Sequence, residues 1–221
     1  MHDGLPANDP GLFECMYNMR AMRRLKPDPV PREMIDQLVE AATRAPSGQN
    51  TQRWAFLVIT EAEGRTFFGE RYRHWFRTLL GDRISELEAD TKAARQMGAA
   101  LYLADHMTEV PLLIIACGKR DWPFAVPEAE RVGLAPPSYG SIYPAVQNLL
   151  LACRGLGLGA SLTTVHQMFE GELRAHFGIP DDYGIVASVP IGFPRGNFGP
   201  VTREPVATKM HLERWGVHPE R

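Results

Sequence analysis

A cluster of positive charge near the N-terminus is the first feature that could do chemistry. It consists of Arg20, Arg23, Arg24 and Lys26. Three prolines follow by position 31, and proline restricts both its own backbone and the residue before it, so the side chains here are held stiffly. Guanidinium groups match phosphate oxygens in pairs, which indicates a phosphate site that Arg203, from a later Gly/Pro-rich turn, could close. The alternative interpretation is a charged face that meets only water.

A short neutral loop, Pro46-Ser47-Gly48-Gln49-Asn50, is the second candidate. It lies between an expected helix and an expected strand, and it carries hydroxyl and amide groups but no charge. Such donors and acceptors suit the edge of a heteroaromatic ring better than an ion. The alternative is an ordinary turn, because Pro, Ser, Gly and Asn are the residues from which turns are built.

No pattern in the chain indicates a reaction carried by side chains alone. The seven histidines show no metal-ligand spacing, and neither a Cys-x-x-Cys pair nor a Gly-x-Ser-x-Gly elbow occurs. The glycines at 155, 157 and 159 follow a helix instead of opening one, which argues against a dinucleotide-binding fingerprint. If the protein is an enzyme, no catalytic side chain is predicted, no metal is expected, and a cofactor carries the chemistry.

Composition limits the class of protein. The 221 residues are 44% hydrophobic and 23% charged with a net charge of −2, which is typical of a globular domain that binds neither nucleic acid nor an anionic membrane. No apolar run reaches membrane-spanning length, and the N-terminus lacks the regions of a signal peptide. Cys15, Cys117 and Cys153 are far apart and are interpreted as reduced core residues. We therefore expect a cytoplasmic protein.

An apolar helix that begins at Ser141 is expected to position these groups. Its apolar residues recur at helical spacing and cover most of its circumference, and the glycine-rich stretch 155–159 ends it. Ser141 is the expected N-cap, which places Pro144 in the first turn, where a missing N–H is tolerated. A helix apolar nearly all round is buried on most sides. It is therefore expected both to form the centre of a core and to be shared with a partner subunit.

The rest of the chain alternates irregularly between helices and strands, which predicts a layered α/β or α+β domain. Residues 1–221 contain no repeat or linker and are expected to form a single domain. Within it, 61–109 is expected to hold two or three exposed helices that form a lid, and 205–221 to be a tail that docks on another surface. Helices are expected at 10–19, 31–44 and 170–177, strands at 54–60, 110–117 and 183–193, an extended segment at 161–164 and a loop at 119–138.

Four stretches, in this order, resemble the FMN-dependent nitroreductase superfamily. They are Arg20-Ala-Met-Arg23, then Ala45–Trp54, then Pro144–Leu151 with Gly155–Thr164, then Pro190–Pro194 with Gly199–Pro205. The resemblance implies an α+β fold, an α/β/α sandwich with a mainly antiparallel central sheet. It also implies a homodimer with the central helix in the interface and FMN in each of two interfacial sites. The implied reaction is ping-pong: NADPH or NADH reduces FMN and leaves, and a nitroaromatic, a quinone or a related small acceptor takes its place.

The resemblance also assigns binding residues. Arg20, Ala21, Arg23 and Arg203 would grip the phosphate and ribityl chain of FMN. The loop residues Pro46, Ser47 and Asn50 would reach the flavin bound mainly by the other subunit. Leu162, Thr163 and Thr164 would line the isoalloxazine ring and place a backbone N–H near its N5, and Ser141, Ile142 and Tyr143 would lie near its benzenoid side.

This chain departs from the family pattern at three positions. Alanine stands at position 21 where serine is frequent, Val201 replaces a lysine that the family often has there, and Arg53 replaces a proline. Fewer phosphate contacts leave open a non-catalytic FMN-binding module. Two further alternatives lie in the same superfamily: fragmentation of the flavin itself, and dehalogenation. The dehalogenating branch holds a zwitterion with a glutamate, a tyrosine and a lysine of the lid; residues 61–109 do not align to that trio, although Glu70, Tyr72 and Lys92 are residues of those types.

Overall fold

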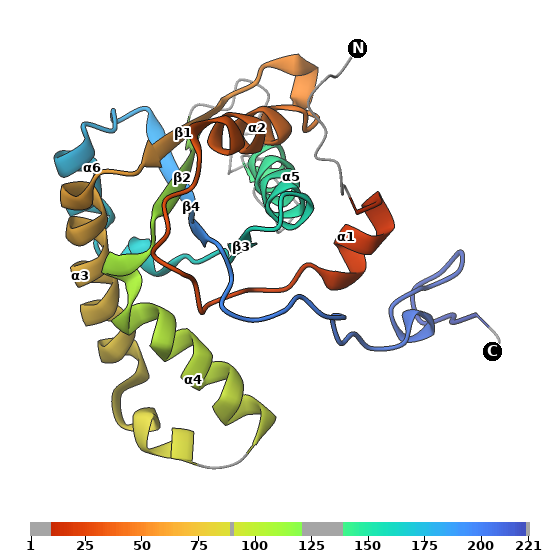
Figure 1. The fold of residues 1–221 in the computed structure, drawn as a ribbon. Coiled ribbons are helices and arrows are strands. Elements are labelled where there is room, and N and C mark those ends of the chain that lie inside the picture. The colour runs from red at the N-terminus through yellow and green to blue at the C-terminus, as the bar shows by residue number, and fades with distance from the viewer. Residues whose placement is uncertain (1–9, 89–90, 121–138, 220–221) are drawn as a thin grey trace, which may run out of the picture.

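The computed structural model describes residues 10–88, 91–120 and 139–219. A four-stranded sheet lies between two layers of helices (Figure 1). Its strands are β1 (Trp54–Ile59), β2 (Leu112–Lys119), β3 (Gly159–Ala160) and β4 (Tyr183–Gly192). They are ordered β1-β2-β4-β3, and every pairing is antiparallel. The expected α+β sandwich is therefore confirmed.

The strand β2 is buried on both faces from Leu112 to Gly118, which explains why its sequence is apolar up to the final Lys119. Successive side chains of a strand point to opposite faces, so Ile114 belongs to one hydrophobic core and Ile115 to the other. Both side chains are 0% exposed. The sheet thus separates two cores, one beneath each helical layer.

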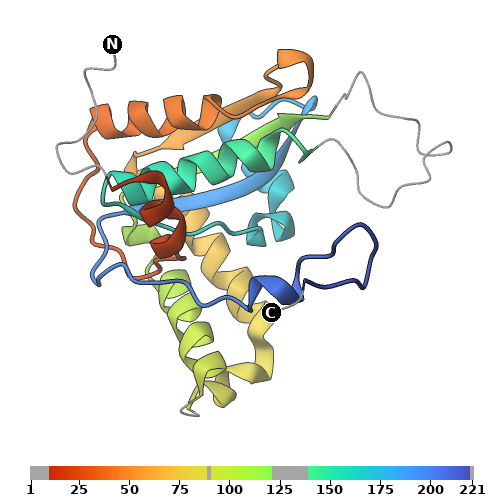
Figure 2. The same ribbon diagram turned by 90° about the vertical axis from the view of Figure 1, so that its right-hand side faces the viewer.

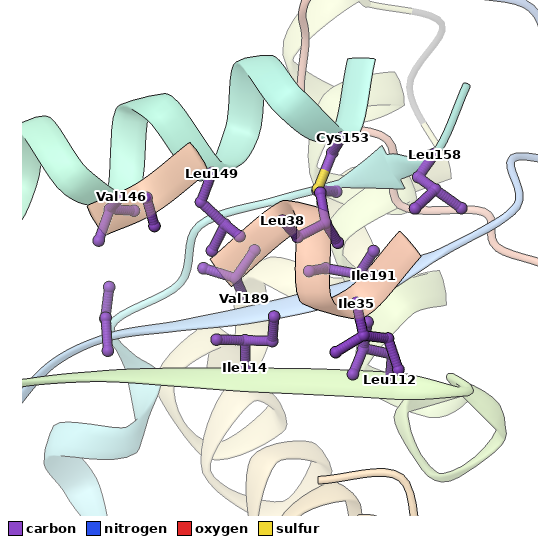
Figure 3. Packing of buried hydrophobic residues seen from close by; sticks show 14 of the residues in the cluster. Ile35, Leu38, Leu112, Ile114, Val146, Leu149, Cys153, Leu158, Val189 and Ile191 are labelled. Atoms are coloured by element: carbon purple, nitrogen blue, oxygen red, sulfur yellow. The ribbon is translucent and has the colours of Figure 1, made fainter. Parts of the chain in front are cut away.

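The first helical layer consists of α2 (Arg32–Thr43) and α5 (Ile142–Gly155), which lie side by side over one face of the sheet (Figure 2). Leu38 of α2 and Leu149 of α5 pack over β2 and β4 (Figure 3). One stripe of α5 is buried, whereas Leu150 and Leu151 remain partly exposed. Within a single chain the central helix is therefore covered on one side and not all round.

The second layer consists of α3 (Ala62–Leu80), α4 (Lys92–Asp105) and α6 (Glu170–Phe177). The 3₁₀ turn Gly81–Glu88 joins α3 to α4, and a shorter one, Met107–Glu109, leads into β2. Gly69 allows α3 to approach that second turn, because a Cβ atom there would lie 2.7 Å from the Thr108 side chain. The face of α3 that carries Phe68 and Tyr72 is part of the core and is not free surface.

The helix α1 and the segment that follows β4 lie against each other beside α5. The helix α1 (Leu12–Asn18) is tied to α5 by the ion pair between Glu14 and Arg154, at 3.1 Å. After β4 the chain returns past α1, where the N–H of Val201 donates to the carbonyl of Tyr17 at 2.9 Å. The tail, with a 3₁₀ turn at Val206–Thr208, then extends away from the sheet (Figure 1).

Several expected boundaries are wrong. The first helix begins at Leu12 with Gly11 at the N-cap, so Pro10 precedes it, and Asp9 lies outside the described residues. Strand β2 starts after Pro111, which has no N–H for the ladder, and runs to Lys119. The loop expected at 119–138 therefore begins later, and residues 121–138 lie outside the described part. The stretch expected to be extended at 161–164 does lie along β4: the N–H of Ser161 donates to the carbonyl of Pro190 at 3.4 Å, and Thr163 forms an antiparallel bridge with Ser188.

Ser141 stands at the N-cap position of α5, but its side chain makes no capping hydrogen bond. Its hydroxyl instead accepts a hydrogen bond from the N–H of Gly48, at 3.3 Å. A serine hydroxyl that accepts a distant backbone donor has one fewer lone pair for its own helix. Ser141 therefore occupies the expected N-cap position without making a capping bond, and its hydroxyl anchors a loop instead.

Within residues 10–88, 91–120 and 139–219, no helix combines the length and the apolar composition needed to cross a bilayer.

Candidate functional site

The cationic segment lies along the sheet edge and is held there by its two apolar residues. Met22 and Leu25 are 7% and 8% exposed, and the N–H of Met22 donates to the carbonyl of Ala160 at 2.9 Å. Gly159 permits this contact, because a Cβ atom there would lie 2.8 Å from the Leu25 side chain. Since the apolar side chains point inward, the arginines between them are left at the surface or half-buried.

These arginines form one wall of a groove of about 500 Å³. The opposite wall is α4, which contributes Lys92 and Arg95. Five cations thus surround one space, and none of the described residues that line it is acidic. Concentrated positive charge of this kind attracts and holds an anion with several oxygens, such as phosphate.

Three of the four residues expected to grip phosphate meet in this groove: Arg20, Ala21 and Arg23. Arg20 also donates to the carbonyl of Asn197 at 2.9 Å, which fixes its direction. Arg203 is exposed and donates to the carbonyl of the adjacent Thr202 at 2.9 Å, so within one chain it lies outside the described lining of the groove.

Lys92 and Arg95 were not predicted as phosphate ligands. Their sequence neighbourhood carries no signal apart from charge, since a lysine and an arginine three residues apart on a helix are common on any solvated surface. Only the packing of α4 against the second core carries them across to the arginine segment. A cation–π contact also joins the cationic segment to α4: the guanidinium of Arg24 lies 4.4 Å from the centre of the Tyr102 ring.

The loop at 46–50 is held in an unusual backbone conformation. Gln49, Asn50 and Gln52 all have positive φ, at 51°, 55° and 48°. Such angles cost free energy in residues other than glycine and are retained where the surroundings impose them, frequently at binding sites. Here the hydroxyl of Ser47 accepts from the N–H of Gln52 at 3.1 Å, and Ser141 holds Gly48.

The loop and the start of α5 therefore come together within one chain. Ser47 is half-buried, whereas Pro46 and Asn50 are exposed. Ile142 is 1% exposed and belongs to the core, whereas Tyr143 is 44% exposed. Figures 1 and 2 place this loop at the opposite end of the molecule from α4, so it does not touch the cationic groove of its own chain.

The segment 162–164 offers backbone donors. Thr163 pairs with Ser188 of β4: its N–H donates to the Ser188 carbonyl at 2.9 Å and its own carbonyl accepts at 3.0 Å. Neighbouring residues of an extended segment present their N–H groups in the other direction. Accordingly, the N–H groups of Leu162 and Thr164 have no acceptor in the part of the chain that the structure describes. Leu162 and Thr164 are also exposed.

A buried tyrosine connects this segment to the arginines. Tyr72 of α3 is 3% exposed, and the Thr163 hydroxyl donates to its hydroxyl oxygen at 3.3 Å. Burial raises the pKa of Tyr72, while the bond from Thr163 and the nearby charge of Arg23 act in the opposite direction. The cationic groove, to which Arg23 belongs, and the segment 162–164 are therefore adjacent.

Glu70, Tyr72 and Lys92, the residues of the types that dehalogenation uses, do not converge. Glu70 and Tyr72 are two residues apart on α3 and so point about 200° apart around the helix. Glu70 is exposed while Tyr72 is buried, and Lys92 lines the groove on α4.

A polar layer lies behind the segment 162–164. His166 is 0% exposed and Ser188 is 0% exposed, with Ser161 at 3%. The Nε2–H of His166 donates to the carbonyl of Ile185 at 3.2 Å, and burial lowers the pKa of the ring, which keeps it neutral. Its Nδ1 and the hydroxyls of both serines have no partner among the described residues. None of these three was singled out from the sequence, where an isolated histidine or serine has no distinguishing pattern.

Known proteins are similar to this chain in sequence and in fold. Residues 18–193 match the Nitroreductase family. The chain is 27% identical over 235 residues to a nitrobenzene nitroreductase of Ectopseudomonas oleovorans, covering 93% of this chain and 96% of that protein. It is 26% identical over 192 residues to iodotyrosine deiodinase 1 of Rattus norvegicus, covering 82% of this chain but only 61% of that protein. The chain thus spans less than two thirds of the deiodinase.

A solved structure of oxidized iodotyrosine deiodinase, bound to FMN and 3-iodo-L-tyrosine, matches with a TM-score of 0.70. The identity is 20%, and the match covers 94% of this chain and 100% of that one, which shows a shared fold. The family match extends from the start of the cationic segment to the end of β4 and includes every element of the sheet. The chain belongs to the nitroreductase family.

Proposed function

We propose that this chain is an FMN-dependent NAD(P)H oxidoreductase that transfers electrons from NADPH or NADH to a nitroaromatic, a quinone or a related small acceptor. The observation that carries the proposal is the groove in which five cations meet, directly beside backbone donors that lack partners. A flavin mononucleotide has both matching parts, a phosphate dianion and a ring with several acceptor atoms.

The residues present fit such a cofactor. Ala21 and Val201 remove two contacts that the family often makes to phosphate, but Lys92 and Arg95 bring two additional charges to the same groove. The unpaired N–H groups of Leu162 and Thr164 can donate to the acceptor edge of a ring. Leu162, with 38% of its surface exposed, offers an apolar patch against which a planar ring can lie.

FMN, when bound, would supply the hydride transfer that the side chains of this chain cannot perform. The residues of the chain would bind and orient it. Arg20 and Arg23 would fix the phosphate end, and the segment 162–164 would fix the ring. The neutral His166 and the buried serines behind that segment would keep it rigid without adding charge next to the ring.

A homodimer would complete each site. The loop at 46–50 is remote from the groove of its own chain and is prepared by strained backbone, so it suits the site of a second copy. Two apolar surfaces lie open to receive that copy: Phe13 on α1 is 68% exposed and Trp215 in the tail is 89% exposed. The partly exposed side of α5 would lie between them, with the tail 205–221 docked on the partner and 61–109 acting as the lid.

The geometry of the described residues gives the alternatives less support. A relative is named iodotyrosine deiodinase, but Glu70, Tyr72 and Lys92 do not face a common space. No described residue favours fragmentation of the flavin over its use as an electron carrier. A non-catalytic FMN-binding module would need the same groove. It would differ from the enzyme only in that it does not turn over substrate.

The test is the visible absorption spectrum of the purified protein after incubation with FMN. It is repeated without oxygen after NADPH or NADH is added, and again after a nitroaromatic or a quinone is added. Bleaching by the nicotinamide and recovery with the acceptor would support the oxidoreductase. A bound flavin that stays oxidised would indicate the binding module, and a benzimidazole product formed with oxygen would indicate fragmentation. The absence of bound flavin would refute all three.

A further inference from the structure

The hydrogen bonds around Thr163 leave one proton without an acceptor. The N–H of Val165 donates to the Thr163 hydroxyl at 3.4 Å, and the hydroxyls of Thr163 and Tyr72 share a bond at 3.3 Å. Three protons, one from the N–H and one from each hydroxyl, therefore enter only two bonds. The remaining hydroxyl proton has no acceptor among the described residues.

No nearby group among the described residues accepts that proton. Arg23, whose charge acts on Tyr72, has only donors. An unpaired donor at a buried position costs free energy, so protein structures supply an acceptor from a neighbouring group, a water or a ligand. Because the Thr163 hydroxyl donates to Tyr72, the spare O–H is that of Tyr72. It lies against the segment whose backbone N–H groups are also unpaired, which indicates that one ligand satisfies all of them.

Tyr72 cannot move away from this position without disturbing the core. Its ring is stacked between Phe68 and Phe76 of the same helix, with centroids 5.8 Å away on each side. Phe68 is 0% exposed. The phenol is thus fixed by apolar packing, and its one polar atom is directed at Thr163. A core position on α3 would be filled more favourably by phenylalanine if packing were its only role.

We propose that Tyr72 is a positioning residue: it holds the Thr163 hydroxyl in place, so that the pair presents one O–H donor to the flavin ring. This inference rests on the proposed function, since the acceptor is the cofactor. It also gives α3, the first helix of the 61–109 segment, a direct part in setting the properties of the flavin. A donor beside the ring stabilises the negative charge that a flavin gains on reduction.

The experiment compares Tyr72→Phe, Thr163→Val and the double variant with the wild-type chain. Phenylalanine preserves the ring stack and valine the β-branched shape, so each removes only a hydroxyl. The readouts are the visible spectrum of bound FMN, its dissociation constant and its midpoint reduction potential. Tyr183→Phe is the matched control, because the Tyr183 hydroxyl forms no hydrogen bond within the described residues and lies at the far end of β4.

Each single variant should lower the midpoint potential and raise the FMN dissociation constant about fivefold, the equivalent of one ordinary hydrogen bond. The double variant should show no further change, because both hydroxyls serve one donor. The control should match the wild type. The inference, but not the proposed function, would be overturned if Tyr72→Phe kept the wild-type spectrum and potential. Fully additive effects in the double variant would overturn it too. A wild-type chain that binds no flavin would overturn the proposed function as well. If Tyr72→Phe does not fold, Thr163→Val decides: unchanged potential overturns the inference and a lowered one supports it.

Discussion

The hydroxyl of Ser141, at the start of α5, accepts a hydrogen bond from the N–H of Gly48, 93 positions earlier in the chain. This bond connects the strained loop at 46–50 to the central helix. A loop in which Gln49 and Asn50 have positive φ, with Gln52 just beyond it, is retained only if its surroundings hold it. Ser141 therefore has a structural role that its position at a helix terminus does not reveal.

Ser141→Ala should therefore release the loop. The expected loss is about 1 kcal/mol in the free energy of unfolding, together with faster amide exchange at Gly48. Denaturant unfolding and hydrogen exchange measure the two effects. Thr66→Ala, at an exposed position without a side-chain hydrogen bond in the described part, serves as the control. Unchanged exchange at Gly48 would show that the loop holds its shape without Ser141.

Removing charge from the groove should weaken FMN binding. Arg20→Ala should raise the FMN dissociation constant about tenfold or more, since charge-assisted hydrogen bonds contribute about 1.5–3 kcal/mol each. Lys92→Ala should raise it less, about threefold, because a lysine acts as a point charge without a bidentate fork. Lys26→Ala is the matched control, because Lys26 belongs to the same cationic segment but does not line the groove. Titration with FMN at several salt concentrations measures these effects, and an equal loss in all three variants would contradict the assignment of the groove.

Polar substitutions on the exposed apolar surfaces should disrupt the proposed dimer. Phe13→Ser and Trp215→Ser each remove a large side chain that is more than two thirds exposed in the single chain. Both variants should shift the protein toward monomer and lower FMN occupancy, as measured by sedimentation and by flavin absorbance. Leu79→Ser, at a 56% exposed position on α3, is the control. A wild-type chain that sediments as a monomer with full flavin would rule out the shared site.

Stability should depend on pH through His166. Its pKa in the folded chain lies below the ordinary value of 6.5, because burial disfavours the charged ring. As pH falls below about 7, the unfolded chain therefore binds the proton first. The free energy of unfolding should decrease by at most about 1.4 kcal/mol for each pH unit until the folded pKa is reached. His166→Gln should flatten this dependence, and His74→Gln, at an exposed position, should not. Denaturant unfolding at several pH values between about 7.5 and 5 measures the slope.

Buried thiols should be unreactive in the folded protein. Burial raises the pKa of Cys117 to about 11 and raises that of Cys153 further, so neither is a thiolate at neutral pH. In a Cys15→Ser background, a thiol reagent at pH 8 should label them only after denaturant is added. Rapid labelling of the folded chain would contradict the burial of these side chains.

The sequence by itself determined the elements whose evidence is local. Helical spacing of apolar residues predicted α2 and α5, and the uninterrupted apolar run predicted β2, because each pattern reports which faces of its own segment are buried. The arginine spacing predicted Arg20 and Arg23 as neighbours, since a short stiff segment keeps its side chains together. Boundaries at proline were less certain, as Pro10 and Pro111 show, because proline is compatible with positions just outside an element as well as at its start.

Only the tertiary structure decided which distant residues meet. Lys92 faces Arg20 because α4 packs on the second core, and Tyr72 meets Thr163 because α3 inserts one aromatic face beneath β4. Ser141 anchors a loop in place of capping its helix because a donor from residue 48 reaches it. Such contacts depend on the relative placement of whole elements, and that placement follows from the combined burial of both cores. No local pattern contains this information, so these contacts are visible only in the tertiary structure.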